Sequence, residues 1–244
     1  MKILVIGDSC TDVFIYGDIE RVCPEAPVPV FKPTHQIKND GMAKNVVANL
    51  KSLGVRVDII TNPNDIKKIR YVDNKSNQLV LRVDEHDYCD RINHNELIQL
   101  YGYDAIIISD YSKGFLTVED IKYICSNYKN VFADIKKYLG EWVKNATFIK
   151  INEFEHKINL EFWPECGKLL IEKLIITKGR EGCEYMGKLF TTQKVSVGDV
   201  SGAGDTFLAG FVFEYLKDKN VEEAIRFAQK CASKVVQKHG VTTI

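Results

Sequence analysis

Short apolar runs alternate with helix-like segments along most of this chain of 244 residues. Such runs suit buried strands, because a helix that covers a core needs a longer amphipathic pattern. Alternation of this kind predicts an α/β fold: a doubly wound, mostly parallel sheet with helices on both faces. We expect strands at 3–6, 55–60, 105–108, 131–134, 147–151 and 173–177, and helices at 43–53, at 118–128 and from 205 and 221 onward.

Two segments interrupt the alternation and predict a small β-sheet lid beside the main sheet. Prolines at 24, 27, 29 and 33 make the first segment extended, with an edge strand at 28–31. In the second segment, strand-like runs at 69–72 and 79–83 flank a polar turn and indicate a hairpin. A further hairpin is expected near 183–190. We therefore expect one domain over 1–244, with lid segments at about 13–37 and 67–84.

Charge and cysteine content exclude several classes of protein. The 33 Lys and Arg residues balance the 33 Asp and Glu residues, so no net charge attracts nucleic acid or a membrane surface. The seven cysteines include no C-x-x-C pair, which argues against a zinc site or a disulfide framework and for a reducing compartment. The apolar start is too short for a signal peptide, and no apolar stretch approaches a membrane span. We expect a cytoplasmic protein without nucleic-acid or membrane partners.

The motif Gly202-Ala203-Gly204-Asp205 precedes an apolar segment with helical spacing. A glycine turn that enters a helix can direct several N–H groups, together with the helix dipole, at one anion. Asp205 then lies in the first helical turn, beside that anion hole. This arrangement suits a base that takes a proton from a hydroxyl while amides stabilise a transferred phosphoryl group. The simpler interpretation is a helix N-terminus with an acidic first turn.

Polar side chains also follow most of the expected strands, at the edge where open parallel sheets bind ligands. Each one alone is a weak signal: Gly7-Asp8 is equally explained as a helix cap or turn, and for the glycine and amide at 41 and 45 capping is the simpler interpretation. As a set they predict the rim of an active site, in which Asn152 and Glu155 are candidates for binding hydrated Mg²⁺. Asp8 and Asp12 are candidates for sugar hydroxyls, and a glycine and an amide at 41 and 45 begin a helix. The remaining candidates are Asp110, Lys113, Lys136, Thr177, Gly179 and Gly182.

In this order, the motifs resemble those of the ribokinase-like (PfkB) family of ATP-dependent sugar kinases. The family pattern is matched by Gly7-Asp8, Gly41 to Asn45, Asn152-x-x-Glu155, Thr177-x-Gly179 and Asp199-x-x-Gly202-Ala203-Gly204-Asp205. The P-E-A-P-V-P-V string at 24–30 and the S-D-Y-S-K-G run at 109–114 are similar to one branch in particular. That branch is the kinase domain of D-glycero-β-D-manno-heptose-7-phosphate kinases, the kinase half of ADP-heptose synthase.

The resemblance implies an ATP- and Mg²⁺-dependent phosphotransferase that acts on a sugar or sugar phosphate, with a monovalent cation as a further candidate cofactor. Asp205 would be the base, the amides of Gly202, Ala203 and Gly204 the anion hole, and Asn152 and Glu155 the residues that manage Mg²⁺ through water. The nucleotide would be lined by Thr177, Gly179, Gly182, Gln229, His239 and Gly240. The substrate side would be formed by Asp8, Asp12, Gly41, Asn45, Asp110, Lys113 and Lys136. A homodimer joined through the lid is also implied.

Three departures from the family pattern qualify this expectation. Met42 stands where the family usually has a second glycine, and its side chain would intrude near the substrate. Only a short connection, 61–68, stands where the family places a further strand and helix. No nucleotidyltransferase domain follows Ile244, so we expect the kinase activity alone. Two other functions therefore stay open: a non-catalytic sugar- or nucleotide-binding protein that kept the fold, and a nucleoside kinase.

Overall fold

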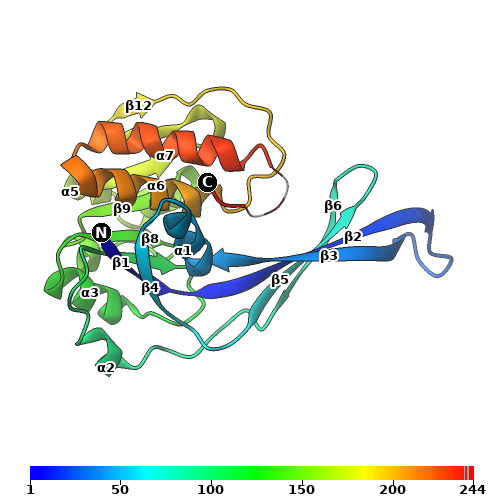
Figure 1. Cartoon of the computed structure of the whole chain (residues 1–244), viewed down its shortest axis with the longest axis horizontal. Helices are drawn as coiled ribbons and strands as arrows, with labels where there is room; N and C mark the ends of the chain where they lie inside the picture. The colour runs from blue at the N-terminus through cyan, green and yellow to red at the C-terminus, as the bar shows by residue number, and fades with distance from the viewer. Residues whose placement is uncertain (239, 241) are drawn as a thin grey trace.

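A larger, mostly parallel sheet forms the body of the protein, and a smaller sheet projects from it (Figure 1). The computed structural model describes residues 1–238, 240 and 242–244. The larger sheet has the order β12-β11-β10-β9-β8-β7-β1-β4; the strands from β10 to β4 are parallel, and β11 and β12 are antiparallel. Its strands are β1 Lys2–Gly7, β4 Arg56–Thr61, β7 Ala105–Asp110, β8 Val131–Ile135, β9 Phe148–Asn152, β10 Leu174–Thr177, β11 Cys183–Tyr185 and β12 Lys188–Phe190.

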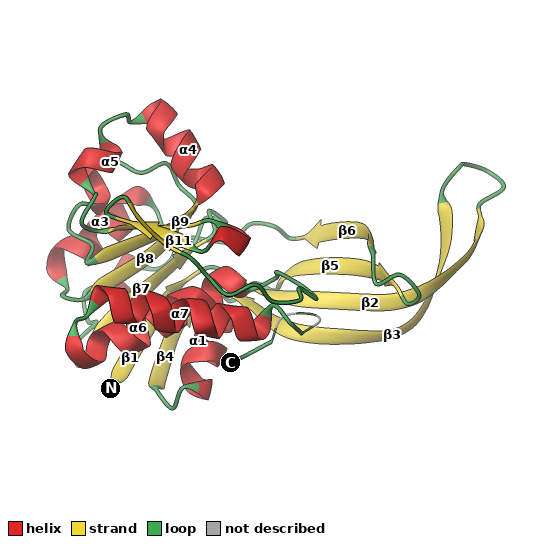
Figure 2. Ribbon diagram, turned by 90° about the horizontal axis from the view of Figure 1, so that it is seen from above, coloured by secondary structure: helices red, strands yellow, loops and turns green. Residues whose placement is uncertain are grey.

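Helices cover both faces of this sheet (Figure 2). The strands are apolar on both sides, as buried parallel strands require: Ile3 and Val5 pack toward one face, Leu4 and Ile6 toward the other. On the first face lie α1 Ala43–Ser52, α6 Ala203–Asp218 and α7 Val221–Val235. The other face carries α2 His94–Leu97, α3 Val118–Asn127, α4 Glu153–Phe162 and α5 Cys166–Leu169. Short 3₁₀ helices span Glu141–Val143 and Gly179–Glu181.

The smaller sheet is a lid formed by the chain as it leaves β1 and returns to α1, together with the segment after β4. Its order is β3-β2-β5-β6, and it extends well away from the body (Figure 1). Strands β2 and β3 form a long hairpin, β5 adds parallel to β2, and β6 pairs antiparallel with β5. The bounds are β2 Ser9–Val22, β3 Pro29–Met42, β5 Ile66–Asp73 and β6 Leu79–Glu85.

The short connection between β4 and β5 is held by the buried side chain of Asn62. Its amide oxygen accepts the N–H of Ser9 at 2.7 Å, and its amide nitrogen donates to the carbonyls of Ser9 at 3.1 Å and Asn64 at 2.7 Å. Thr61 adds a hydrogen bond to the carbonyl of Gly7 at 2.7 Å. The side chain of Asn62 thus hydrogen-bonds backbone groups of β2 and of the connection itself at the point where body and lid meet.

The predicted α/β fold with a small β lid is confirmed, and every expected strand and helix is present. Sequence reasoning missed β2, α2, α4 and α5. Strand β2 lacks a clear alternation because Asp12, Gly17 and Asp18 interrupt its apolar residues. Strand β3 is an edge strand, as expected, but continues from Pro29 to Met42. No helix in the described part of the chain is long and apolar enough to cross a membrane.

Candidate active site

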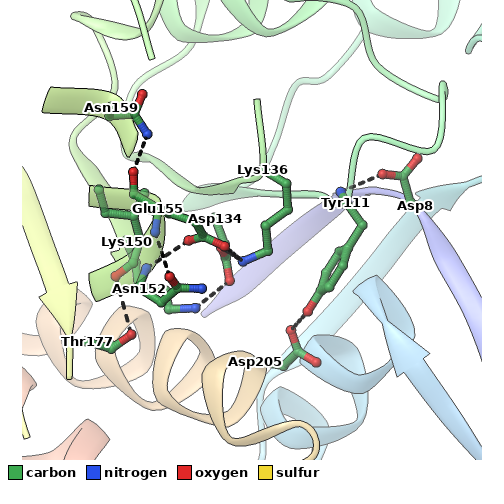
Figure 3. Close-up of polar contacts among 11 residues, drawn as sticks. Asp8, Tyr111, Asp134, Lys136, Lys150, Asn152, Glu155, Asn159, Thr177 and Asp205 are labelled. Atoms are coloured by element: carbon green, nitrogen blue, oxygen red, sulfur yellow. Dashed lines mark hydrogen bonds and ion pairs between the residues drawn. The ribbon is translucent and has the colours of Figure 1, made fainter. Parts of the chain in front are cut away.

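Polar side chains from several strands of the body converge at the N-terminus of α6 (Figure 3). They follow or end β1, β7, β8, β9 and β10, at the carboxyl edge of the parallel strands, where the lid also joins the body. The described residues at this edge include most of the site predicted from the sequence. The structure shows which of them touch one another and which hold the fold together.

The turn before α6 depends on Gly202, which adopts a left-handed backbone conformation with φ 77° and ψ −1°. The first N–H groups of a helix have no partner inside the helix, so those of Gly204 and Asp205 remain available beyond its end. Gly204 also permits a close approach: a Cβ atom there would lie 2.8 Å from the ammonium nitrogen of Lys150. Amide donors and a cation therefore meet at one point.

Asp205 is buried in the first turn of α6, and both of its carboxylate oxygens accept hydrogen bonds. Asn45 of α1 donates to Oδ2 at 2.9 Å, and the hydroxyl of Tyr111 donates to Oδ1 at 2.6 Å. Burial raises the pKa of Asp205 to about 6, against the opposite effect of the two hydrogen bonds. A carboxyl group with this pKa is mostly ionised at neutral pH and can accept a proton.

A chain of buried amide and hydroxyl groups lies behind this carboxylate and holds Asn45 in place. The amide of Asn49 donates to Oδ1 of Asn45 at 3.0 Å and to the carbonyl of Asn45 at 2.9 Å. Thr206 donates to Oδ1 of Asn49 at 3.2 Å. Helices α1 and α6 are therefore joined by side-chain hydrogen bonds directly behind Asp205, which fixes the orientation of Asn45.

Two lysines and two carboxylates form a second cluster beside Asp205 (Figure 3). The buried Asp134 of β8 pairs with Lys150 at 2.7 Å and with Lys136 at 3.1 Å. Burial alone would raise the pKa of Asp134, but the two lysines outweigh it and hold the pKa below its usual value. Lys136 also pairs with Glu155 at 2.6 Å, and its own pKa is raised by the two carboxylates despite burial. The cluster links β8, β9 and α4.

Asn152 and Glu155 form a capping box at the N-terminus of α4. The side chain of Asn152 accepts the N–H of Glu155 at 2.8 Å, and Oε2 of Glu155 accepts the N–H of Asn152 at 2.8 Å. Oε1 of Glu155 faces Lys136. Among the described residues, no group of three or more His, Cys, Asp or Glu side chains could hold a metal ion. These oxygens therefore fit Mg²⁺ only in an outer role, through water and alongside phosphate oxygens.

Asp8 is fully buried and holds the loop after β7. Its carboxylate accepts backbone N–H groups from Tyr111 at 2.6 Å, Lys113 at 3.3 Å and Phe115 at 3.3 Å. Asp8 was expected to face a sugar, and its two oxygens are instead occupied by this loop. Its described contacts make it the anchor that places Tyr111.

The other candidates on the substrate side also have protein partners. Asp12 of β2 pairs with Arg70 of β5, and Asp110 pairs with Lys137. One buried oxygen of Asp110 has no hydrogen-bond partner among the described residues. Lys113 pairs with Asp87 at 2.5 Å, and Gly41 lies opposite Cys10 across β2 and β3. Two further substrate-side candidates lie at the site: Asn45 contacts Asp205, and Lys136 forms ion pairs with Asp134 and Glu155.

A partly buried lysine of the lid faces the site without an ion pair of its own. The ammonium of Lys68 lies 5.2 Å from the ring centre of Tyr111. Burial lowers the pKa of Lys68, and repulsion from Arg82 and Lys113 acts in the same direction. Among the residues that the structure describes, Lys68 forms no salt bridge, whereas Arg82 pairs with Asp84 at 2.7 Å. The nearby Asp12 opposes this effect but pairs with Arg70, so Lys68 is left as a cation without a salt bridge among the described residues.

The nucleotide-side candidates lie beyond β9 and β10. Thr177 donates to the carbonyl of Ile151 at 3.3 Å, and Gly179 is exposed, with no atom of the described residues within 4 Å of the position of a Cβ. Gly182 and Gln229 serve packing: a Cβ at Gly182 would collide with the carbonyl oxygen of Phe190, to which Gln229 donates at 2.5 Å. Two further candidates lie near the C-terminus: Gly240 donates to Asp199 at 3.2 Å, and His239 lies outside the described residues.

Met42 differs from expectation in where its bulk lies. Its side chain is only 3% exposed and packs in an apolar cluster with Cys10 and Ile66. The unusual feature is the backbone, with φ 58° and ψ −129°, a conformation that glycine adopts more readily. The methionine that stands where the family usually has glycine therefore affects the backbone conformation just before α1, while its side chain packs in the apolar cluster.

Sequence reasoning placed Asp134 and the run 109–114, which contains Tyr111, at the strand ends that form the expected rim, but it gave neither residue an individual role and did not consider Lys150. Tyr111 and Asp134 directly follow or end buried strands, so their position was a usable signal. Lys150 gave a different signal, because a lysine inside the apolar run of β9 must be paired if it is buried. These three residues complete the surroundings of Asp205.

Comparison with known proteins shows the family to which this chain belongs. Residues 59–244 match the model of a protein family described as "pfkB family carbohydrate kinase". The bifunctional protein HldE of Nitratiruptor sp. is 31% identical over 293 residues, covering 99% of this chain and 63% of that protein. The HldE protein of Campylobacter jejuni is 31% identical over 293 residues, covering 100% of this chain and 62% of its own length. The chain thus spans less than two thirds of these relatives.

Solved structures share the fold at low sequence identity. A mutant of phosphofructokinase-2 from Escherichia coli has a TM-score of 0.76 at 12% identity, covering 99% of this chain and 95% of that one. Ribokinase from Thermotoga maritima has a TM-score of 0.71 at 18% identity, with coverages of 98% and 94%. Arabidopsis thaliana ribokinase complexed with ribose and ATP has a TM-score of 0.68 at 15% identity, with coverages of 98% and 93%. With its α/β fold and β lid, this chain belongs to the pfkB family of carbohydrate kinases.

Proposed function

We propose that this protein transfers the γ-phosphoryl group of ATP to a hydroxyl of a sugar phosphate similar to heptose 7-phosphate, in the cytoplasm. The observation that carries the proposal is the buried carboxylate of Asp205 beside the free N–H groups of α6 and the ammonium of Lys150. Phosphoryl transfer requires positioning and charge stabilisation more than covalent steps, and this site supplies both.

In this mechanism Asp205 accepts the proton of the attacking hydroxyl. Asn45 and Tyr111 donate hydrogen bonds to its carboxylate. The N–H groups of the turn 202–205 and the ammonium of Lys150 stabilise negative charge on the transferred group. Mg²⁺ bound with ATP would neutralise phosphate charge, and Asn152 and Glu155 are the residues that would hold it, through water.

Lys68 supports a substrate that already carries a phosphate. It is a partly buried cation without an ion pair among the described residues, and Arg82 and Lys113 lie near enough to lower its pKa. A phosphate dianion would relieve this repulsion and accept charge-assisted hydrogen bonds. The HldE relatives and the motifs at 24–30 and 109–114 favour a heptose phosphate among such substrates.

The two alternative functions are less well supported. A binding protein without turnover does not need a buried, hydrogen-bonded carboxylate at the anion hole, because burying such a charge costs several kcal/mol. A nucleoside kinase would need no unpaired lysine at the acceptor side. We retain the kinase with a phosphorylated sugar as substrate.

ADP release measured with a panel of sugars, sugar phosphates and nucleosides tests the substrate class. We expect turnover with a sugar phosphate, and we expect Lys68→Met to raise its KM about tenfold because one charge-assisted contact is lost. The KM for ATP should not change, and Lys122→Met, at an exposed lysine of α3, serves as the control. Equal turnover with free sugars or nucleosides, unaffected by Lys68→Met, would refute this assignment.

We also propose a homodimer joined through the outer face of the lid. Ile15, Tyr71 and Leu81 lie in register across β2, β5 and β6 on this face, and Phe31 packs edge-on against Tyr71. On the opposite face Phe14 is 3% exposed, whereas Leu81 on the outer face is 54% exposed. A two-fold contact would cover the outer face with its own copy.

Two leucines of β6 allow a matched test of the dimer. Leu81→Asp places a charge in the outer face and should convert dimers to monomers in light scattering. Leu79 is 55% exposed but pairs with Val72, on the side of the lid that faces the body, so Leu79→Asp should leave the dimer intact. A wild-type protein that is monomeric at assay concentrations would contradict the proposal.

The raised pKa of Asp205 predicts a pH-dependent stability. Between the unfolded pKa of about 4 and the folded pKa of about 6, the native state binds more protons, so the stability contributed by this site falls as the pH rises. Asp205→Asn removes this titration. The stability of the variant relative to wild type should therefore increase from about pH 4 to pH 6 and be constant above that range. Denaturant titrations at several pH values measure it, with the exposed Asp90→Asn as control; a difference independent of pH would contradict the burial of an ionised Asp205.

A further inference from the structure

The hydroxyl of Tyr111 contacts Asp205, and its backbone N–H contacts the buried Asp8. The phenol donates to Oδ1 of Asp205 at 2.6 Å, while Asn45 donates to the other oxygen at 2.9 Å. The backbone N–H of Tyr111 donates to Asp8 at 2.6 Å. Because Asp8 also binds two later N–H groups of the same loop, the position of the phenol is fixed by a buried anchor.

The ring of Tyr111 lies near two ammonium groups from different parts of the protein. Lys68 of the lid is 5.2 Å from the ring centre, and Lys136, after β8, is 5.4 Å from it. Cations at these distances are attracted to the aromatic ring. Tyr111 therefore lies between the lid, the lysine cluster and Asp205, and Figure 3 shows its side chain reaching from the loop to the carboxylate.

We propose that Tyr111 is the positioning residue of the base: its hydroxyl orients the carboxylate of Asp205 and keeps it ionised in the enzyme before substrate binds. This inference rests on the proposed role of Asp205. Phenylalanine at this position would keep the ring and its lysine contacts and would lose only the hydrogen bond.

The charged and titratable groups around Asp205 make this hydroxyl important. The negative charge of Asp134 disfavours the ionised form of Asp205, and the positive charge of Lys150 favours it. The thiol of Cys10 lies within electrostatic range, but burial raises its pKa to about 12, so it stays neutral. Burial and the neighbouring Asp205 raise the pKa of Tyr111 well above its usual value, so the phenol remains a donor. Tyr111 and Asn45 are the groups that donate hydrogen bonds directly to the ionised carboxylate.

The pH profile of Tyr111→Phe tests the proposal. The acid limb of kcat/KM, which reports the free enzyme, should move to higher pH by about one unit, because a hydrogen bond to a charged group is lost. At pH 6, near the wild-type pKa, the ionised fraction and hence the rate should fall about fivefold relative to wild type, and the loss should shrink at higher pH. Tyr128→Phe removes a hydroxyl that donates to the carbonyl of Leu97, away from the site, and should not shift the profile.

A second measurement does not depend on catalysis. The pH-dependent stability assigned to Asp205 should shift upward in Tyr111→Phe by the same amount. Unchanged acid limbs and unchanged stability profiles in Tyr111→Phe would overturn the positioning role. Asp205→Asn, measured beside it, separates the two proposals: full activity of that variant would remove Asp205 as base, whereas an inactive Asp205→Asn with an unshifted Tyr111→Phe profile would reject Tyr111 alone.

Discussion

A buried carboxylate at the first turn of α6 is the constraint on which the rest of the site depends. An ionised group removed from water is tolerated only when hydrogen bonds and nearby charges replace its hydration. Asn45 and Tyr111 supply the hydrogen bonds, and each is held in turn: Asn45 by Asn49, and Tyr111 by Asp8. The first strand, the first helix, the loop after β7 and α6 are thus connected through one aspartate.

The second cluster follows from the same requirement. Lys150 lies against Gly204, and alone it would place an uncompensated charge inside the protein. Asp134 pairs with it at 2.7 Å and also binds Lys136, which extends the network to the capping box of α4. Positive and negative charges therefore alternate from the helix N-terminus to α4. In the proposed reaction, phosphate groups would enter a site whose cations are already in place, which reduces the reorganisation needed for transfer.

Much of this architecture was predictable from the sequence, because buried parallel strands and amphipathic helices leave strong periodic patterns. The Gly202 turn and Asp205 were identifiable because their motif lies within four consecutive residues, directly before an apolar helix. Contacts between distant segments were not predictable: nothing near Asp8 in the sequence indicates that it binds the loop 111–115. The spacing of Asn152 and Glu155 fits both a capping box and an outer Mg²⁺ site, and the structure shows the capping box directly. Strand β2 was missed because its polar residues obscure its alternation.

The measurement that tests the central claim most directly is single-turnover phosphoryl transfer by Asp205→Asn, with ATP affinity measured on the same variant. If Asp205 is the base, ATP should bind with nearly wild-type affinity, while transfer to the sugar phosphate slows by about two to four orders of magnitude. Transfer at the wild-type rate would contradict the account, since the buried carboxylate and its hydrogen bonds would then have no part in the reaction.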